Sequence, residues 1–143
     1  MSLPESIRRR VRLPIIAAPM FLVSGPRLVT AACRAGVIGA FPTANCRSLD
    51  ELEQWLAELS GVVSGECAPY AANLIVHRSN SRLADDLALV CRYRPELVIT
   101  SVGSPAPVAD DIHAYGGLVL ADVATMHHAR KALESGADGL ILL

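Results

Sequence analysis

The sequence predicts an α/β fold built on a parallel sheet, and the order of its apolar segments is the main observation. Six short apolar runs recur along the 143 residues, and each of the first five precedes a segment with helical apolar spacing. Strands are predicted to start near positions 15, 37, 70, 97, 118 and 139, so one β-α unit recurs every twenty to thirty residues. Such regular alternation is typical of parallel sheets. Composition agrees, because a chain that is 52% hydrophobic but only 4% aromatic suits a sheet buried on both faces.

The first unit begins with the apolar run Pro14–Met20, which we interpret as a strand. Ser24 and Pro26 then indicate the start of a helix, and Gly36 indicates its end. The preceding arginines make the segment "RRRVRLPIIAAPMFLVSG" imitate a secretory signal peptide. Two prolines interrupt the apolar run, however, and no later segment approaches the ~18 apolar residues that a membrane helix requires. We therefore expect a strand, a cytoplasmic protein and no membrane partner.

The second unit shows the clearest helix signals. Its strand is predicted at Val37–Phe41, and Ser48 with Glu51 forms a capping box at the start of the next helix. Gly61 is predicted to stop that helix. The other strands are predicted in the segments "YAANLIV", "ELVITSVG", "GGLVLADV" and "DGLILL", and the fifth helix runs from about Thr125 to Ser135.

Two architectures accept this alternation: an open doubly wound sheet, and a (β/α)₈ TIM barrel of which this chain forms the first six strands. A whole barrel usually takes about 250 residues, so 143 residues are too few to close one. We therefore expect a single domain over residues 1–143: an incomplete (β/α)₈ barrel with about six parallel strands and five helices. An open barrel exposes two strand edges, which predicts a homo-oligomer formed through them.

Net charge and sequence motifs exclude several classes of partner and site. The 13 basic and 14 acidic residues leave a net charge of −1, which gives no footprint for nucleic acid. The four cysteines include no C-x-x-C pair, so no metal site is predicted, and buried reduced thiols are expected. No H-E-x-x-H, P-loop or Ser-His-Asp order is present either. A small-molecule ligand is therefore the expected partner.

In both architectures, ligands bind at the carboxyl ends of the strands. Mostly uncharged residues stand there, which predicts an apolar slot with a few polar groups, suited to a planar heteroaromatic ligand. The candidate ligand-binding residues at these strand ends are Pro19, Met20, Phe21, Thr43, Asn73, Ser101 and Asp122.

Three of these candidates have a structural alternative. Asn73 interrupts an apolar strand, so its amide either meets a ligand or bonds a neighbouring loop. Asp122 alternatively caps the following helix, and that interpretation is the stronger one from the residues alone. Met20 alternatively fills a gap in the core.

The segments "LPIIAAPM", "AACRAGVIGAFPTAN", "YAANLIVHRSN", "VITSVGSP" and "HHARKALESGADGLILL" together resemble the nitronate monooxygenase family, also called 2-nitropropane dioxygenases. These enzymes are FMN-containing TIM barrels, and the similarity covers essentially the whole chain in the right order. The resemblance implies that Pro19 and Met20 pass close to the flavin through their main chain. It also implies that the side chain of Asn73 lies at the flavin, whereas Asp122 stands where relatives often have lysine.

The function that this resemblance implies is FMN-dependent oxidation of alkyl nitronates by molecular oxygen, with the protein orienting the flavin and tuning its charge. The family's catalytic histidine follows strand six, and the sequence stops before that loop, so no catalytic residue is assigned here. An FMN-dependent enoyl reductase is the alternative enzyme, because that related family shares the early motifs. A non-catalytic binding or assembly module is the third interpretation, and a doubly wound mononucleotide binder is the fourth.

Overall fold

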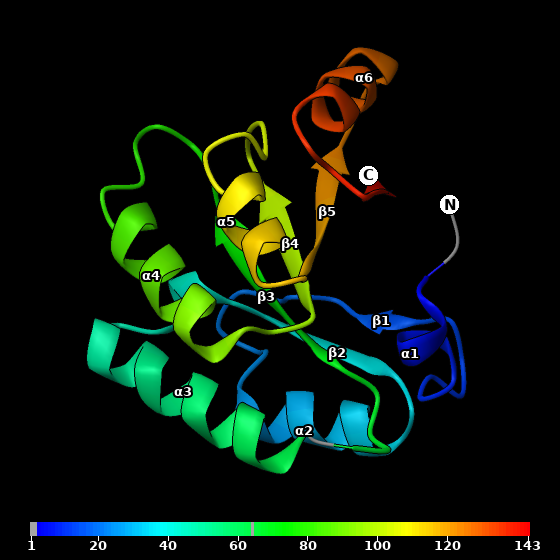
Figure 1. The fold of residues 1–143 in the computed structure, drawn as a ribbon. Coiled ribbons are helices and arrows are strands. Elements are labelled where there is room, and N and C mark those ends of the chain that lie inside the picture. Colours follow the sequence, from blue (N-terminus) through cyan, green and yellow to red (C-terminus); the bar gives the residue numbers. More distant parts are fainter. Residues whose placement is uncertain (1–2, 64) are drawn as a thin grey trace.

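The computed structural model describes residues 3–63 and 65–143, which form one curled parallel sheet with helices on its outer face (Figure 1). The sheet runs in the order β1-β2-β3-β4-β5-β6, and every neighbouring pair is parallel. A doubly wound sheet requires a reversal of strand order, which this sheet lacks. The prediction of an incomplete (β/α)₈ barrel is therefore confirmed. The strands are β1 (Ile16–Ala17), β2 (Ile38–Pro42), β3 (Tyr70–Ile75), β4 (Leu97–Ser101), β5 (Leu118–Val123) and β6 (Gly139–Leu142).

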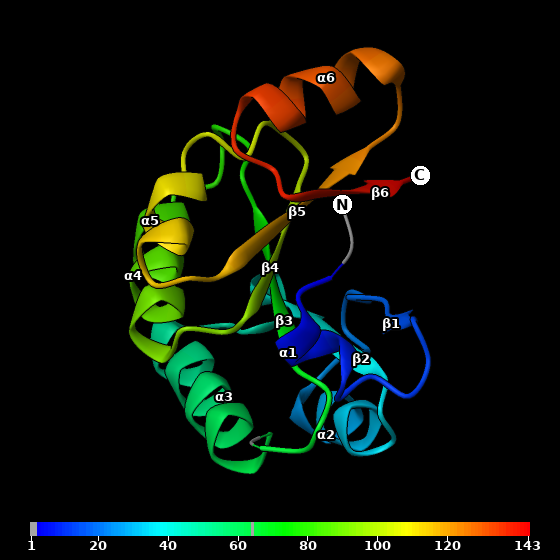
Figure 2. The same ribbon diagram turned by 45° about the vertical axis from the view of Figure 1, so that its right-hand side comes forward.

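One helix follows each of the first five strands, as predicted, and Figure 2 shows these helices around the outside of the curl. Two shorter helices were not predicted, one before β1 and one after β2. The five covering helices are α2 (Pro26–Arg34), α3 (Leu49–Val62), α4 (Leu83–Tyr93), α5 (Ala109–Ala114) and α6 (Met126–Glu134). The unpredicted ones are α1 (Glu5–Arg8) and the 3₁₀ helix η1 (Thr43–Asn45).

Two apolar layers hold the sheet, one on each face. The outer layer packs strand residues such as Phe41 and Leu74 against helix residues such as Leu56. The inner layer contains Ala71, Leu97 and Ile99, and it also contains Ile7 of α1. Because α1 packs against the inner face, the curl is filled at the amino ends of its strands. The opposite end, where the strands finish, is the end that can receive a ligand.

The first arginine cluster has a structural role at that filled end. Arg10 Nη1 donates to Glu96 Oε1 at 2.8 Å, which ties the segment after α1 to the start of β4. One arginine of the basic segment that imitates a signal peptide therefore forms a tertiary contact of the fold. Among the described residues, no helix is long and apolar enough to cross a membrane.

Local signals predicted most element boundaries, with two corrections. Strand β1 covers two residues rather than the run Pro14–Met20, because proline lacks the N–H that a parallel ladder needs. Gly61 does not end α3, which continues to Val62. The predicted cap at Ser48 is present, since its side chain accepts the Glu51 N–H at 3.1 Å.

Candidate ligand-binding site

A chain of hydrogen bonds joins the ends of three neighbouring strands. Asn73 of β3 donates through Nδ2 to Ser101 Oγ of β4 at 2.7 Å, and Ser101 Oγ donates to Asp122 Oδ2 of β5 at 2.5 Å. The three residues belong to different β-α units, and the parallel register brings them to one end of the sheet. We call this set the Asn73–Ser101–Asp122 relay. Sequence reasoning selected each member separately, and the structure brings all three together.

The relay fixes which way the Asn73 amide points. Nδ2 of Asn73 also donates to the carbonyl oxygen of Ile99 at 3.2 Å, so both of its N–H groups are used inside the protein. Ser101 has a single hydroxyl proton, which it gives to Asp122, and therefore it can only accept from Asn73. Among the hydrogen bonds of the described residues, none reaches Oδ1 of Asn73. The residue is 5% exposed, so the bonds position this acceptor in a nearly buried place.

Asp122 does not cap the following helix. Thr125 is the residue before α6, and its side chain accepts the His128 N–H at 3.1 Å. The alternative that assigned Asp122 a capping role is therefore wrong. The residue still belongs to β5, and the carboxylate turns to Ser101 on the neighbouring strand.

Exposed apolar side chains accompany the relay at the strand ends. Phe21 is 65% exposed in the loop after β1, and Val102 is 63% exposed directly after β4. Leu22 and Val102 both have positive φ, 61° and 62°, in a region that leucine and valine rarely adopt. Strained backbone of this kind gathers at functional loops. Both loops lie at the end of the sheet where a ligand is expected.

Asn45 fastens the loop after β1, and sequence reasoning missed it. Its Nδ2 donates to the carbonyl oxygens of Met20 and Ser24, at 3.1 and 2.8 Å. Its Oδ1 accepts the Leu22 N–H at 2.8 Å, which holds Leu22 in its strained conformation. The Met20 N–H is also used inside the loop, because it donates to Ser24 Oγ at 3.0 Å. Met20 therefore has no free main-chain donor, and this part of the loop can approach a ligand by packing.

Replacing Asn45 by alanine is expected to loosen the loop after β1 without unfolding the sheet. The lost hydrogen bonds correspond to a local cost of about 1 kcal/mol, or roughly fivefold faster exchange of the Leu22 amide proton with solvent. Hydrogen exchange followed by NMR measures this, with the Val119 amide at the opposite end of the sheet as the internal control. Equal acceleration at both amides would show global destabilisation instead.

Two other predicted residues are less prominent in the structure. Thr43 is 1% exposed in η1, so it presents little surface to a ligand. Pro19 is half-buried between β1 and the loop that Asn45 holds. Both stand at the correct end of the sheet, and their contact with a ligand stays a prediction.

Two of the four cysteines, Cys33 and Cys46, are fully buried thiols. Burial raises the pKa of Cys33 to about 11 and that of Cys46 to about 12, so both thiols stay protonated near neutral pH. Within residues 3–63 and 65–143, no group of three or more His, Cys, Asp or Glu side chains is placed to hold a metal ion. His113 is structural, since its Nε2 lies 2.9 Å from Asp138 Oδ2 at the amino end of the sheet.

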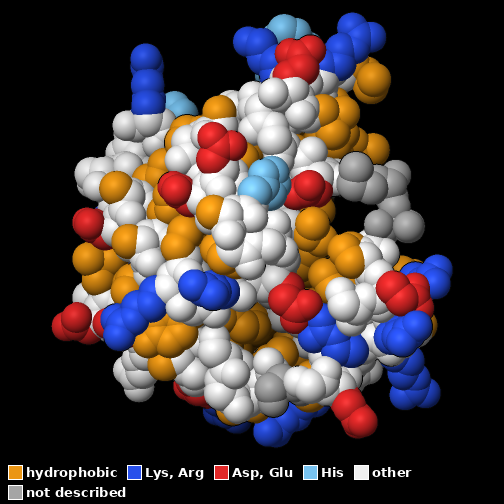
Figure 3. Space-filling view, viewed as in Figure 1, with side chains coloured by type: hydrophobic (Ala, Val, Ile, Leu, Met, Phe, Trp, Pro, Cys, Tyr) orange, Lys and Arg blue, Asp and Glu red, His pale blue; other side chains and the backbone are white. Residues whose placement is uncertain are grey.

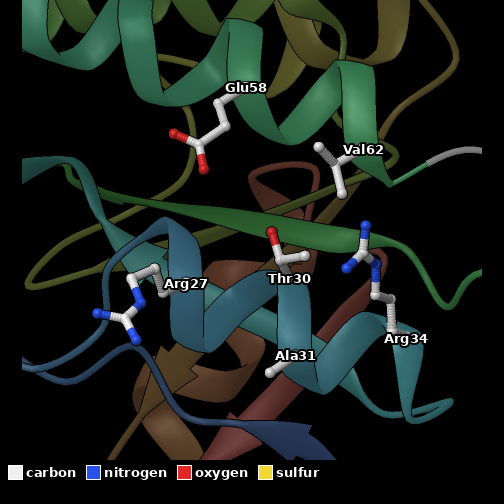
Figure 4. A pocket seen from close by; sticks show the side chains of 6 residues that line it. All are labelled: Arg27, Thr30, Ala31, Arg34, Glu58 and Val62. Carbon is white, nitrogen blue, oxygen red and sulfur yellow. The ribbon is translucent and has the colours of Figure 1, made fainter.

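A separate hollow lies on the outer face between α2 and α3 (Figure 4), with a volume of about 360 Å³. Arg27, Arg34 and Glu58 line it, and Thr30 Oγ1 is buried there without a hydrogen-bond partner. Because the hollow sits among the covering helices, it does not belong to the site at the strand ends. On the face shown in Figure 3, basic and acidic side chains are interspersed, so this face has no patch of one sign.

Known proteins share this architecture. FabK from Thermotoga maritima superposes with a TM-score of 0.82 and 22% identity, covering 94% of this chain and 41% of that one. A nitroalkane oxidase from Streptomyces ansochromogenes gives a TM-score of 0.80 and 24% identity, covering 96% and 48%. The fold of this chain is that of an incomplete TIM barrel, and both structures contain it.

One relative in sequence and two further solved structures also match the chain. A 5-hydroxy-7a-methyl-1-oxo-octahydro-1H-indene-4-carboxyl-CoA dehydrogenase of Mycobacterium tuberculosis is 25% identical over 129 residues, which are 90% of this chain and 35% of the relative. An enoyl reductase domain of MlnA from Bacillus amyloliquefaciens gives a TM-score of 0.74 and 16% identity, covering 87% and 31%. A mandelate oxidase carrying a C4a-OH-FMN adduct gives 0.61 and 18%, covering 91% and 48%. No protein-family model matches the chain.

The chain spans about a third of the curated relative and less than half of the FabK and nitroalkane oxidase chains. The nitroalkane oxidase, the CoA-compound dehydrogenase, the enoyl reductase domain and the mandelate oxidase are named for oxidation or reduction, and the mandelate oxidase holds an FMN adduct. These likenesses establish the barrel fold for this chain.

Proposed function

We propose that the chain forms part of the FMN site of a flavin-dependent oxidoreductase that oxidises alkyl nitronates with molecular oxygen. The Asn73–Ser101–Asp122 relay carries the flavin part of the proposal, because it is a prearranged polar group at the ligand-binding end of an incomplete TIM barrel. The fold match to a nitroalkane oxidase supports the choice of substrate class.

The residues present fit the ring side of FMN. Oδ1 of Asn73 and the carboxylate of Asp122 are acceptors, and the flavin imide N–H and ribityl hydroxyls are donors. Exposed apolar side chains such as Phe21 and Val102 offer packing surface for a planar ring. When bound, FMN would supply the electron transfer between the substrate and oxygen.

This chain's own residues would orient the cofactor and restrict water around it. The buried bonds of Asn73 hold its free oxygen in one direction, so a bound donor meets a preorganised partner. Asn45 keeps the loop after β1 in the conformation that exposes Phe21. We assign no proton-transfer step to the described residues.

A second candidate function is FMN-dependent reduction of an enoyl thioester. The curated relative acts on a carboxyl-CoA compound, and the MlnA domain is named an enoyl reductase. Because the relay would face the flavin rather than the substrate, it supports the flavin part of both candidates, and turnover decides between their substrates.

Cofactor binding and turnover test the proposal in two steps. We expect the purified protein to quench FMN fluorescence saturably, and Asn73→Ala to weaken FMN binding by about tenfold through loss of a buried hydrogen bond. Oxygen uptake with propionate 3-nitronate is then compared with NAD(P)H oxidation driven by an enoyl thioester. Turnover of the thioester alone would select the second candidate.

The control variant is Glu134→Gln, which changes an exposed residue at the end of α6 and should leave FMN binding unchanged. If neither the wild-type protein nor any variant binds FMN, the flavin proposal is wrong and the binding-module interpretation takes its place.

A further inference from the structure

The hydrogen bonds within the relay determine which of its donors and acceptors remain free for a ligand. Asn73 donates its two amide protons to Ile99 and Ser101, and Ser101 donates its only hydroxyl proton to Asp122. Asp122, as a carboxylate, has no proton to give. Every donor of the relay is therefore used internally, and what remains for a ligand is Oδ1 of Asn73 and the unused lone pairs of Asp122.

The charge of the relay, like its free acceptor atoms, favours a ligand that is a cation or a hydrogen-bond donor. Among the described residues, no arginine, lysine or histidine forms an ion pair with Asp122. Arg82, in the loop after β3, is paired with Asp86 instead. Asn73 and Ser101 carry no charge, so the relay as a whole carries the charge of Asp122.

We propose that the Asn73–Ser101–Asp122 relay is an acceptor-only site that binds a neutral or cationic group rich in hydrogen-bond donors and rejects anions. This deepens the proposed function and rests on it where the ligand is flavin: the relay would take the donor edge of the ring or a ribityl hydroxyl. A nitronate anion would then be held away from β5. An anionic acceptor beside the relay would meet like charge and no donor, which costs binding energy on both counts.

The test uses two probe ions of similar size and opposite character. Guanidinium and nitrate are both planar with threefold symmetry, but guanidinium is a cation that only donates and nitrate is an anion that only accepts. Each is titrated below denaturing concentration into the purified protein, with sodium chloride as the ionic-strength reference. NMR follows the Asn73 side-chain amide and the backbone amides of Ser101 and Asp122.

We expect guanidinium to shift these resonances at least about fivefold more than nitrate, because the site offers it a charge-assisted bond. Asp122→Asn should reduce the guanidinium response to the level of nitrate, whereas Glu134→Gln, which removes one carboxylate from the opposite end of the sheet, should leave it unchanged. An equal or larger response to nitrate, or a guanidinium response that survives Asp122→Asn, overturns the proposal.

Riboflavin separates this inference from the proposed function. It has the donor groups of FMN without the phosphate, and Asp122→Asn is expected to weaken its binding by about tenfold. If riboflavin and FMN both fail to bind while the ion responses are as expected, the flavin function fails and the acceptor site stands. If riboflavin binds equally well to wild-type protein and Asp122→Asn, the assignment of the relay to the flavin's donors is wrong.

Discussion

Replacing Arg82 by methionine is expected to lower the free energy of unfolding by about 3–5 kcal/mol, because it leaves a buried carboxylate without its partner. Arg82 Nη2 lies 2.9 Å from Oδ1 of Asp86, whose side chain is 3% exposed. Arg82 Nη1 also donates to the Cys46 carbonyl at 2.7 Å, so the guanidinium joins the loops that follow β2 and β3. Urea unfolding followed by circular dichroism measures the loss.

Arg92→Met is the matched control, since Arg92 lies on α4, the helix that Arg82 precedes, and pairs with Glu53 at an exposed position. Exposed pairs contribute about 0–1 kcal/mol, so this variant should remain nearly as stable as wild type. Arg82→Lys keeps the charge and should lie between the two, which preserves the comparison if Arg82→Met does not fold. Equal effects of Arg82→Met and Arg92→Met would contradict the role given to burial.

Gly39→Ala is expected to destabilise the protein by about 1–3 kcal/mol through overpacking between β2 and α2. A Cβ at Gly39 would lie 2.6 Å from the carbonyl oxygen of Val29 and 3.0 Å from its Cα. Both atoms belong to the backbone of α2, so relief requires the helix to move. Because α2 follows the loop after β1, we also expect weaker flavin binding in this variant.

Gly61→Ala is the same type of substitution, but it is expected to raise the stability of the protein. Nothing lies within 4 Å of a Cβ placed there, and Gly61 is inside α3. Alanine should therefore stabilise the helix by about 0.5–1 kcal/mol. Thermal unfolding of the two variants side by side checks both signs, and destabilisation by Gly61→Ala would be inconsistent with the packing described.

The strand pattern was predictable because each strand is a short apolar run bounded by glycine, proline or a helix signal. The predicted starts differ from the observed ones by no more than one residue, as at Ile16 and Ile38. Helix α1 was missed because four residues carry no helical periodicity. It is held by tertiary contacts, through burial of Ile7 in the inner layer and the bonds of Arg10 to Glu96.

The site was predictable residue by residue but not as a unit. The rule that ligands bind at strand ends selected Asn73, Ser101 and Asp122 separately. Their hydrogen bonds depend on the register of three strands, which the sequence does not specify locally. The capping interpretation of Asp122 was wrong for the same reason, since its partner lies on the neighbouring strand. Asn45 was missed because its bonds are to the backbone of a loop more than twenty residues away, and Arg82 was missed because its bond to the Cys46 carbonyl and the burial of Asp86 depend on the tertiary fold.

The most direct test of the central claim is where FMN binds on the protein. Titration with FMN, followed by amide resonances in NMR, should shift Leu22, Ser101 and Asp122 at the strand ends. The amides of Val119 and Asp138 at the opposite end, and of Thr30 in the hollow between α2 and α3, should stay unchanged. Shifts confined to Thr30 or to the opposite end, with none at the relay, would contradict a flavin site at the carboxyl ends of this sheet.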